Sequence, residues 1–264
     1  MSVEAPRWGE RHALVTGGGR GIGRAVTQAL LGAGGRVTVM GRQALTPEAR
    51  VSLAGDPAAA ERLHAVTADV TDAEGLARAF DAATQRFGAI DTLVNNAGQA
   101  TSAPVLKTDM ALWQRMLAVN LTGAWLCTQQ VLPGMLTAGW GRVVNVASTA
   151  AQRGYAYVSA YCAAKHGVLG LTRALALEMA TKGITVNAVC PGYTETDLLQ
   201  VSVDNIVAKT GRNAEEARAQ LAEGNPQKRL VQPGEVAATV LWLCQADAGS
   251  ITGQAISVSG GEVM

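Results

Sequence analysis

Tyr161 and Lys165 are four residues apart in the segment Tyr161-Cys162-Ala163-Ala164-Lys165. On a helix this spacing places both side chains on one face. A phenol has a pKa of roughly 10, which is too high for a good base near neutral pH. A neighbouring ammonium stabilises phenolate, so we expect Lys165 to lower the pKa of Tyr161. The pair could then move a proton to or from a substrate oxygen. An amphipathic helix face with a solvated lysine is the alternative.

A glycine-rich segment near the N-terminus could hold a phosphate. The apolar run 12–16 leads into Thr16-Gly17-Gly18-Gly19-Arg20-Gly21-Ile22-Gly23, and an amphipathic segment follows. Glycines there let the backbone turn tightly and approach a pyrophosphate at the positive end of a helix. The spacing is T-G-x-x-x-G-x-G rather than G-x-G-x-x-G. A plain tight turn is the alternative, but the position between a strand and a helix favours dinucleotide binding.

The end of the second apolar run bears on the choice of nicotinamide. An acidic residue there binds the ribose 2′-hydroxyl of NAD and repels the 2′-phosphate of NADP. The chain instead reads Val39-Met40-Gly41-Arg42, without a carboxylate, and Arg20 lies inside the glycine loop. Two guanidinium groups suit a phosphate dianion. The sequence therefore favours NADP(H), while NAD(H) stays open because the arginines could be solvated surface charges.

The elements that must position these residues alternate between strands and helices. The predicted strands cover residues 12–16, 36–40, 63–67, 92–95, 142–147, 185–190 and 255–258. Most are continuous apolar runs, which is typical of parallel strands covered on both faces. Repeated strand–helix units imply right-handed crossovers. We therefore predict one α/β domain over residues 1–264, with a Rossmann-like, doubly wound, mainly parallel seven-stranded sheet and helices on both faces.

Two segments interrupt this alternation. Residues 43–60 are rich in alanine and proline and predict a surface turn with a short helix. Residues 193–230 form a long polar excursion, and we expect a substrate lid there because compact domains rarely keep so long an insertion without a use. Elsewhere, residues 113–136 and 161–182 predict two long helices. Their apolar residues extend around much of each helix, which indicates contacts between subunits.

Composition excludes several classes of protein. The chain has 264 residues, 48% of them apolar, and a net charge of +1, which gives no electrostatic case for nucleic acid or a membrane surface. The four cysteines and three histidines are scattered without metal-ligand spacing, so no metal is expected. The N-terminus lacks an apolar leader and no apolar run reaches membrane-spanning length. We expect a cytoplasmic protein with reduced thiols.

Taken in order along the chain, these and further motifs resemble the short-chain dehydrogenases/reductases over nearly the whole length. Asp69 ends the third strand in Ala68-Asp69-Val70, and Asn95-Asn96-Ala97-Gly98 ends the fourth. Asn120 lies in the next helix and Ser148 ends the fifth strand. Tyr161 and Lys165 match Y-x-x-x-K, and Pro191-Gly192 follows the sixth strand. Each motif is weak alone, but their shared order is specific.

The resemblance implies a site. The implied catalytic residues are Asn120, Ser148, Tyr161 and Lys165. The implied cofactor-binding residues are Gly17, Gly19, Arg20, Gly21, Ile22, Gly23, Arg42, Asp69, Val70, Asn96, Ala97, Gly98, Tyr161, Lys165, Pro191, Gly192 and Thr194. The implied substrate-binding residues are Ser148, Tyr155 and Tyr161. By analogy Asn120 holds a water that links Lys165 to solvent, although it could also bridge helix backbone.

The resemblance also implies an activity, the interconversion of a ketone and a secondary alcohol. The style of residues 188–199 is closest to reductases of 3-oxoacyl thioesters, on CoA or a carrier protein, and to polyketide ketoreductases. Lys209, Arg212, Lys228 and Arg229 could meet a CoA or carrier phosphate, or could simply be solvated. A cyclic, aromatic, sugar or steroid alcohol is the alternative substrate. A catalytically silent dinucleotide sensor is the alternative function, and a homotetramer is the assembly that the family implies.

Overall fold

The computed structural model describes residues 8–264; residues 1–7, part of the N-terminal stretch without a predicted leader, lie outside them. Seven parallel strands form one sheet in the order β3-β2-β1-β4-β5-β6-β7. The strands are β1 (His12–Thr16), β2 (Arg36–Gly41), β3 (Leu63–Thr67), β4 (Thr92–Asn95), β5 (Gly141–Val146), β6 (Ile184–Pro191) and β7 (Ala255–Val258). The predicted Rossmann-like fold is confirmed, and the sheet is parallel throughout.

The sheet is central because its strands are apolar on both faces. Every residue of β1, β5 and β6 is buried. From β1 the chain proceeds outward in one direction through β2 and β3, and then crosses to the other side of β1 to form β4. The strand order therefore reverses between β1 and β4. At such a switch point the connections leave in opposite directions and open a crevice at the carboxyl ends of the strands. The glycine loop, Asn96 and Ser148 all follow strands at that edge.

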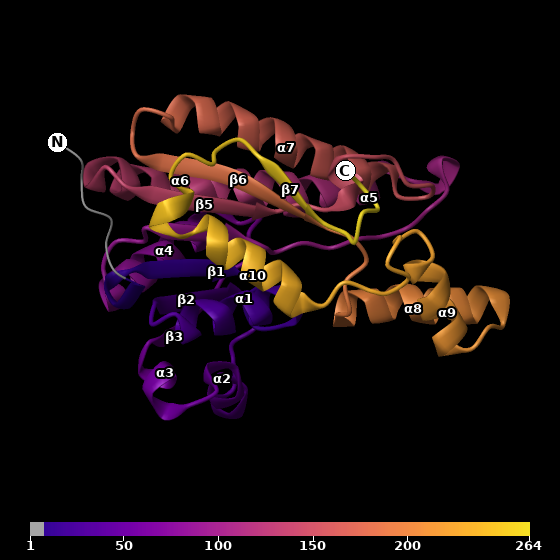
Figure 1. Ribbon diagram of the computed structural model, residues 1–264, viewed down its shortest axis with the longest axis horizontal. Coiled ribbons are helices and arrows are strands. Elements are labelled where there is room, and N and C mark those ends of the chain that lie inside the picture. Colours follow the sequence, from indigo (N-terminus) through magenta and orange to yellow (C-terminus); the bar gives the residue numbers. More distant parts are fainter. Residues whose placement is uncertain (1–7) are drawn as a thin grey trace.

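Helices cover both faces (Figure 1). On one face α1 (Gly21–Gly32) packs beside α10 (Pro233–Leu243), and their apolar residues join the core of β1 and β2. On the other face α4 (Ala73–Phe87), α6 (Gly123–Ala138) and α7 (Ser159–Met179) enclose a second cluster with β1, β4, β5 and β6. Short 3-10 segments occur at Trp8–Glu10, Val105–Lys107, Thr149–Ala151 and Ala246–Ala248.

Two predicted segments differ from the structure. The single helix expected over 113–136 is α5 (Met110–Leu117), a π-helical turn (Ala118–Thr122) and then α6. Residues 43–60 contain two short helices, α2 (Pro47–Ala54) and α3 (Pro57–Glu61), each begun by a proline after a capping side chain, Thr46 or Asp56. The π turn widens the helix at Asn120. Such turns are often found at functional sites.

The excursion at residues 193–230, here called the lid segment, contains α8 (Asp197–Thr210) and α9 (Ala214–Ala222). These helices form a lobe beyond the carboxyl ends of the strands (Figure 1). Leu199, Val203, Ala217, Ala222 and Leu230 give the lobe a small core of its own. Within residues 8–264, no helix has the length and hydropathy needed to cross a membrane.

Candidate active site

The structure brings Ser148, Tyr161 and Lys165 together at the carboxyl end of β5. Ser148 directly follows the strand region and caps the turn Thr149–Ala151, its Oγ accepting from the Ala150 amide at 3.1 Å. Tyr161 and Lys165 lie in the first turns of α7, which packs against β6. Ser148 forms a hydrogen bond with the Tyr161 hydroxyl. A serine and a phenol that share a hydrogen bond can both contact one substrate oxygen.

Lys165 is buried, with 5% of its surface exposed. Its Nζ donates to the carbonyl of Val146 at 2.9 Å and lies 5.7 Å from the centre of the Tyr161 ring. Gly98 lies beside it, and a β-carbon there would be in ordinary contact with Nζ at 3.7 Å but would clash with Oδ1 of Asn120 at 2.9 Å. Lys165 is therefore not a solvated lysine on an amphipathic helix face, which was the alternative interpretation of the sequence.

The expected lowering of the tyrosine pKa is wrong for this structure. Burial raises the pKa of Tyr161 to about 12, although the hydrogen bond from Ser148 acts in the other direction. Burial also lowers the pKa of Lys165 to about 8. Since Nζ is directed at Val146 rather than at the phenol oxygen, its charge does not offset the desolvation of phenolate. Tyr161 therefore keeps its proton near neutral pH and has one to donate.

Asn120 bridges backbone groups around the π turn. Its Nδ2 donates to the carbonyls of Gln99 and Met116 at 2.9 and 3.0 Å, and its Oδ1 accepts from the Gln99 amide at 3.2 Å. The structural role that the sequence left open is thus present. These bonds connect the loop after β4 to the helix that precedes α6, so they hold Gly98 beside Lys165.

The glycine loop fits a dinucleotide phosphate. Gly17 and Gly21 have positive φ angles of 64° and 51°, which favour glycine. A β-carbon at Gly23 would lie 2.2 Å from the Gly17 carbonyl oxygen, so only glycine allows α1 to begin this close to the loop. Helix α1 has no side-chain cap at Arg20, which leaves its first backbone N–H groups for an anion. Gly19 and Ile22 complete the loop, and Ile22 packs on the core below.

The loop after β4 holds the glycine loop in place. Asn96 donates from Nδ2 to the carbonyls of Thr16 and Gly17 at 2.9 and 3.2 Å. The amides of Asn96 and Ala97 both donate to Thr16 Oγ1, at 3.0 and 2.9 Å. Asn96 and Ala97 therefore have structural roles at the switch point, beside the coenzyme contacts that the resemblance implies.

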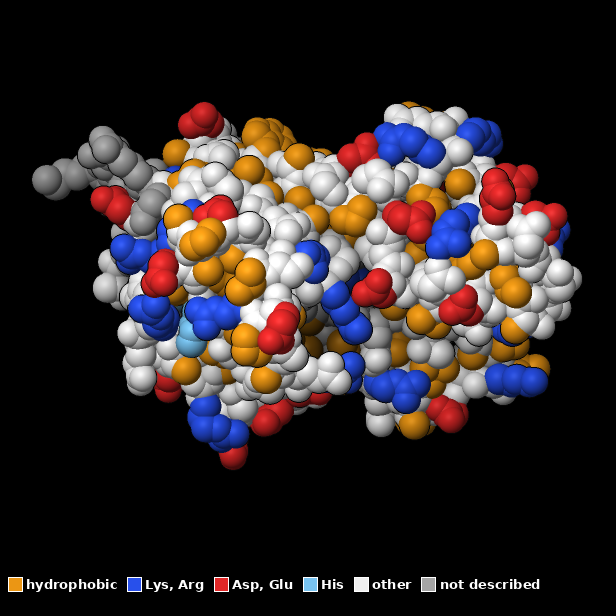
Figure 2. Space-filling model, turned by 90° about the horizontal axis from the view of Figure 1, so that it is seen from below, with side chains coloured by type: hydrophobic (Ala, Val, Ile, Leu, Met, Phe, Trp, Pro, Cys, Tyr) orange, Lys and Arg blue, Asp and Glu red, His pale blue; other side chains and the backbone are white. Residues whose placement is uncertain are grey.

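Charged side chains lie along the outer end of this crevice. Asp69 accepts hydrogen bonds from the backbone amide and the hydroxyl of Thr71, at 2.9 and 2.7 Å. The hydrogen bond from the backbone amide is the main cause of the lowered pKa of Asp69, and the charge of Arg42 contributes. Arg42 and Arg20 are both exposed. Val70, next to Asp69, is buried and packs on Gly123. Figure 2 shows basic side chains beside a hollow between the main body and the α8–α9 lobe.

The lid segment begins against the glycine loop. Thr194 donates to the Gly192 carbonyl at 2.9 Å, and Gly192 donates from its amide to Val258 at 3.0 Å. Thr196 caps α8, and a β-carbon at Gly21 would lie 3.2 Å from its methyl group. The sequence did not single out Thr196; its signal is a capping threonine before Asp197.

Tyr155 and Tyr157, between Ser148 and Tyr161, have different surroundings. Tyr157 is 66% exposed, has a positive φ of 67° and accepts at its carbonyl from Ala103 at 2.7 Å. Tyr155 is half-buried, and its ring meets that of Tyr193 edge-on at 6.4 Å. Its hydroxyl is engaged by Thr149 and by Glu262, at 2.7 and 2.5 Å, so it is not free for a substrate. The sequence did not single out Glu262.

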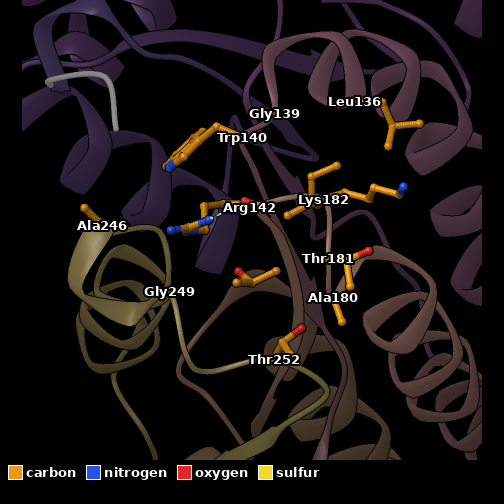
Figure 3. Close-up of a pocket in the computed structure, with 13 residues that line it drawn as sticks. Leu136, Gly139, Trp140, Arg142, Ala180, Thr181, Lys182, Ala246, Gly249 and Thr252 are labelled. Carbon is orange, nitrogen blue, oxygen red and sulfur yellow. Dashed lines mark hydrogen bonds between the residues drawn. The ribbon is translucent and has the colours of Figure 1, made fainter. Parts of the chain in front are cut away.

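A separate cavity of about 630 Å³ opens at the other edge of the sheet, where β5 and β6 begin (Figure 3). Trp140, Arg142 and Lys182 lie on its walls, and the Arg142 guanidinium stacks on the Trp140 ring at 4.4 Å. No candidate site residue lines it. Among residues 8–264 no group of three histidine, cysteine or acidic side chains could hold a metal ion.

A phosphate-binding glycine loop at the switch point, with a serine, a tyrosine and a lysine at the neighbouring strand ends, defines a nicotinamide-dependent oxidoreductase of the α/β class. Comparison with known proteins agrees. The family profile described as short chain dehydrogenase matches residues 11–206. The chain therefore belongs to the short-chain dehydrogenase/reductase family, whose members act on CH–OH groups.

Relatives align over almost their whole length. The chain is 36% identical over 252 residues to the acetoacetyl-CoA reductase of Cupriavidus necator, covering 96% of this chain and 98% of that protein. It is 36% identical over 252 residues to the 3-oxoacyl-[acyl-carrier-protein] reductase of Aquifex aeolicus, covering 94% and 96%. The crystal structure of a variant of the actinorhodin polyketide ketoreductase with NADPH superposes with a TM-score of 0.89 at 37% identity, covering 98% and 99%.

Proposed function

We propose that this enzyme reduces the keto group of a 3-oxoacyl thioester to a secondary alcohol with NADPH. The observation that carries the proposal is the hydrogen-bonded Ser148–Tyr161 pair beside a buried Lys165 at the carboxyl end of β5. Similarity to reductases of acetoacetyl-CoA and of 3-oxoacyl carrier proteins supports the thioester. The reverse oxidation uses the same residues.

The chain's own groups do the following. Ser148 donates a hydrogen bond to the substrate oxygen and orients the carbonyl. Tyr161, kept protonated by its raised pKa, gives its proton to that oxygen as negative charge develops. Lys165 holds positive charge below the phenol and would bind the nicotinamide ribose. Asn120 keeps the surrounding backbone in place and would support proton resupply. When bound, the coenzyme supplies the hydride.

The glycine loop, with Gly17, Gly19, Gly21 and Gly23, would hold the pyrophosphate at the start of α1. Asp69 and Val70 would flank the adenine, and Gly98, Pro191, Gly192 and Thr194 would line the nicotinamide end. The exposed Arg20 and Arg42 support NADP over NAD, because no carboxylate ends β2 and guanidinium groups suit a 2′-phosphate. The relative solved with NADPH is consistent with this choice.

Replacing Arg42 by alanine tests the coenzyme assignment. A charge-assisted hydrogen bond is worth about 1.5–3 kcal/mol, so the KM for NADPH should rise about tenfold to a hundredfold. The kinetics with NADH should change little. Steady-state rates with both coenzymes measure this, and Arg24→Ala, whose guanidinium contacts Ser52, is the control. Wild-type kcat/KM that is as high for NADH as for NADPH would refute the assignment.

Fewer basic side chains of the lid segment are available to a phosphate than the sequence suggested. Arg229 forms a two-pronged ion pair with Glu235 at 2.8 and 2.6 Å, which lowers the pKa of Glu235 to about 2. Arg212 donates to Gln220 at 2.5 Å and Lys228 to the Glu223 carbonyl at 2.9 Å. Of the four basic residues, Lys209 is then the best candidate contact for a CoA or carrier phosphate.

A panel of ketones tests the substrate. NADPH oxidation should be fastest with acetoacetyl-CoA, slower with the N-acetylcysteamine thioester of the same acid, and slowest with cyclic, aromatic, sugar or steroid ketones. Faster turnover of one of the latter would move the enzyme to the alternative class of alcohols. Coenzyme binding without turnover of any ketone or alcohol would favour the sensor.

We further propose a cytoplasmic homotetramer. Trp113, Trp125 and Leu177 are 36%, 43% and 81% exposed, although they lie on helices of the same sheet face. A second copy of the chain would cover this apolar surface. All four cysteines are buried and unpaired, which suits a reducing compartment.

A further inference from the structure

The C-terminal tail, residues 259–264, carries a buried carboxylate that the proposed reaction does not use. The Glu262 side chain is only 5% exposed, while Gly261 before it and Met264 after it are exposed. Burying a carboxylate costs free energy unless hydrogen bonds and charges compensate. The groups that contact Glu262 therefore indicate its role.

Tyr155 is the main partner. Its Oη lies 2.5 Å from Oε1 of Glu262 and 2.7 Å from Oγ1 of Thr149. A phenol has one proton and a carboxylate has none, so Tyr155 donates to Glu262 and accepts from Thr149. Burial first, and then the bond to Glu262, raise the pKa of Tyr155, which stays protonated. Arg153 adds positive charge, with Nη1 at 3.9 Å from Oε1 and the guanidinium over the Tyr155 ring.

The same carboxylate contacts two other segments. A β-carbon at Gly192, just after β6, would lie 3.1 Å from Oε2, and one at Gly224, two residues after α9 ends, would lie 3.6 Å from Oε1. The preceding glycines continue this contact with the lid. A β-carbon at Gly260 would lie 2.1 Å from Oδ1 of Asn225, and one at Gly261 would lie 3.4 Å from Pro226.

Glu262 thus joins the loop that follows Ser148, the turn after β6 and the base of the lid segment. Tyr155 lies between Ser148 and Tyr161 in the chain, and its ring meets that of Tyr193, the second residue after Pro191. A shift of Tyr155 would therefore move both the wall beside the catalytic pair and the start of the lid.

We propose that Glu262 is a positioning residue for the substrate pocket, which fixes Tyr155 and holds the lid base against the catalytic loop. The wall at Tyr155 then presents an aromatic ring to the substrate, because its hydroxyl is occupied. The inference rests on the proposed ketone reduction, since the pocket is the one that reaction uses.

Kinetics of matched variants test the proposal. Glu262→Ala should raise the KM for acetoacetyl-CoA severalfold, and at most about a hundredfold, because the hydrogen bond that fixes Tyr155 sets the upper limit of the effect. Its kcat should stay within about threefold, because the Tyr161 hydroxyl does not bond to Tyr155 or Glu262. The Kd for NADPH should change less than the KM, since Glu262 meets the coenzyme site only at Gly192. Glu262→Gln keeps an acceptor for the phenol and should recover most of the KM. Glu223→Ala removes an exposed carboxylate one residue before Gly224 and should change nothing.

Tyr155→Phe removes the donor, and the double variant with Glu262→Ala should be no worse than the more impaired single variant. An unchanged KM in Glu262→Ala would overturn the proposal, and so would a fall in kcat alone or equal effects of alanine and glutamine. If Glu262→Ala does not fold, as judged by circular dichroism, the glutamine variant and Tyr155→Phe carry the test.

A second measurement does not need turnover. Trypsin can cut the lid segment after Lys209, Arg212 and Arg218. Cleavage there, followed by intact-mass spectrometry, should become several times faster in Glu262→Ala and remain unchanged in Glu262→Gln and Glu223→Ala. Equal cleavage in all variants would refute the link to the lid. If the wild type reduces no ketone, the proposed function fails while this readout still tests Glu262.

Discussion

Replacing Tyr161 by phenylalanine is expected to lower kcat by about 10²- to 10⁴-fold, the usual contribution of a general acid. The ring keeps its place in the first turn of α7, and only the hydroxyl beside Ser148 is lost. The Kd for NADPH, measured by fluorescence titration, should therefore change little. Rates of acetoacetyl-CoA reduction at saturating coenzyme measure the effect.

Tyr157→Phe is the matched control, since it removes a hydroxyl from an exposed tyrosine four residues earlier. Its rate should stay within about twofold of the wild type. Near-normal turnover of Tyr161→Phe would exclude Tyr161 as the acid. The proton would then have to come from another group, and Tyr155 is poorly placed because its hydroxyl already donates to Glu262.

Replacing Lys165 by methionine is expected to lower kcat/KM by about 10²-fold or more and to weaken coenzyme binding. The buried ammonium lies 5.7 Å from the centre of the Tyr161 ring and close to Gly98, where the nicotinamide ribose would lie. Losing the interaction with the ribose and the positive charge beside the phenol ring should cost a few kcal/mol in total, at about 1.4 kcal/mol per tenfold in rate. Lys165→Arg keeps the charge and should retain more activity.

The pH dependence gives a separate test of Lys165. Its pKa of about 8 means that the ammonium is charged below that pH and neutral above it, whereas Tyr161, with a pKa of about 12, keeps its proton throughout. The kcat/KM for reduction should therefore fall as pH rises through about 8. This fall should be absent in Lys165→Met and displaced upward in Lys165→Arg. An unchanged fall in both variants, or unaltered coenzyme affinity, would contradict the two roles.

Most of the fold could be predicted because its signals are local. Strands buried on both faces are continuous apolar runs, so the predicted limits agree with β1, β3, β4 and β7 and differ by one residue at some ends of the others. The helix predicted over 113–136 was interrupted by a tertiary cause. Asn120 bonds to Gln99, 21 residues earlier in the chain, and no helical pattern encodes that contact.

The site divides in the same way. Tyr161, Lys165 and the glycine loop are recognisable because their partners lie within a few residues or follow strand ends. The direction of the pKa shift of Tyr161 was predicted wrongly, because the shift depends on burial and on the orientation of Nζ of Lys165. Glu262 was missed because its partner Tyr155 is 107 residues away, and a glutamate after two glycines has no local signature.

The contact between the C-terminal tail and residues 224–226 has a consequence for remodelling this enzyme. In the proposed reaction the chemistry is carried by strand ends and by α7, while the lid segment and the C-terminal tail would complete the wall that faces the substrate. Replacing residues 193–230 alone with the lid of another enzyme would place different side chains against Gly260 and Gly261, and these contacts would no longer be complementary. A chimera that exchanges lid and tail together keeps their shared surface, so the two segments should be inherited, and engineered, as a pair.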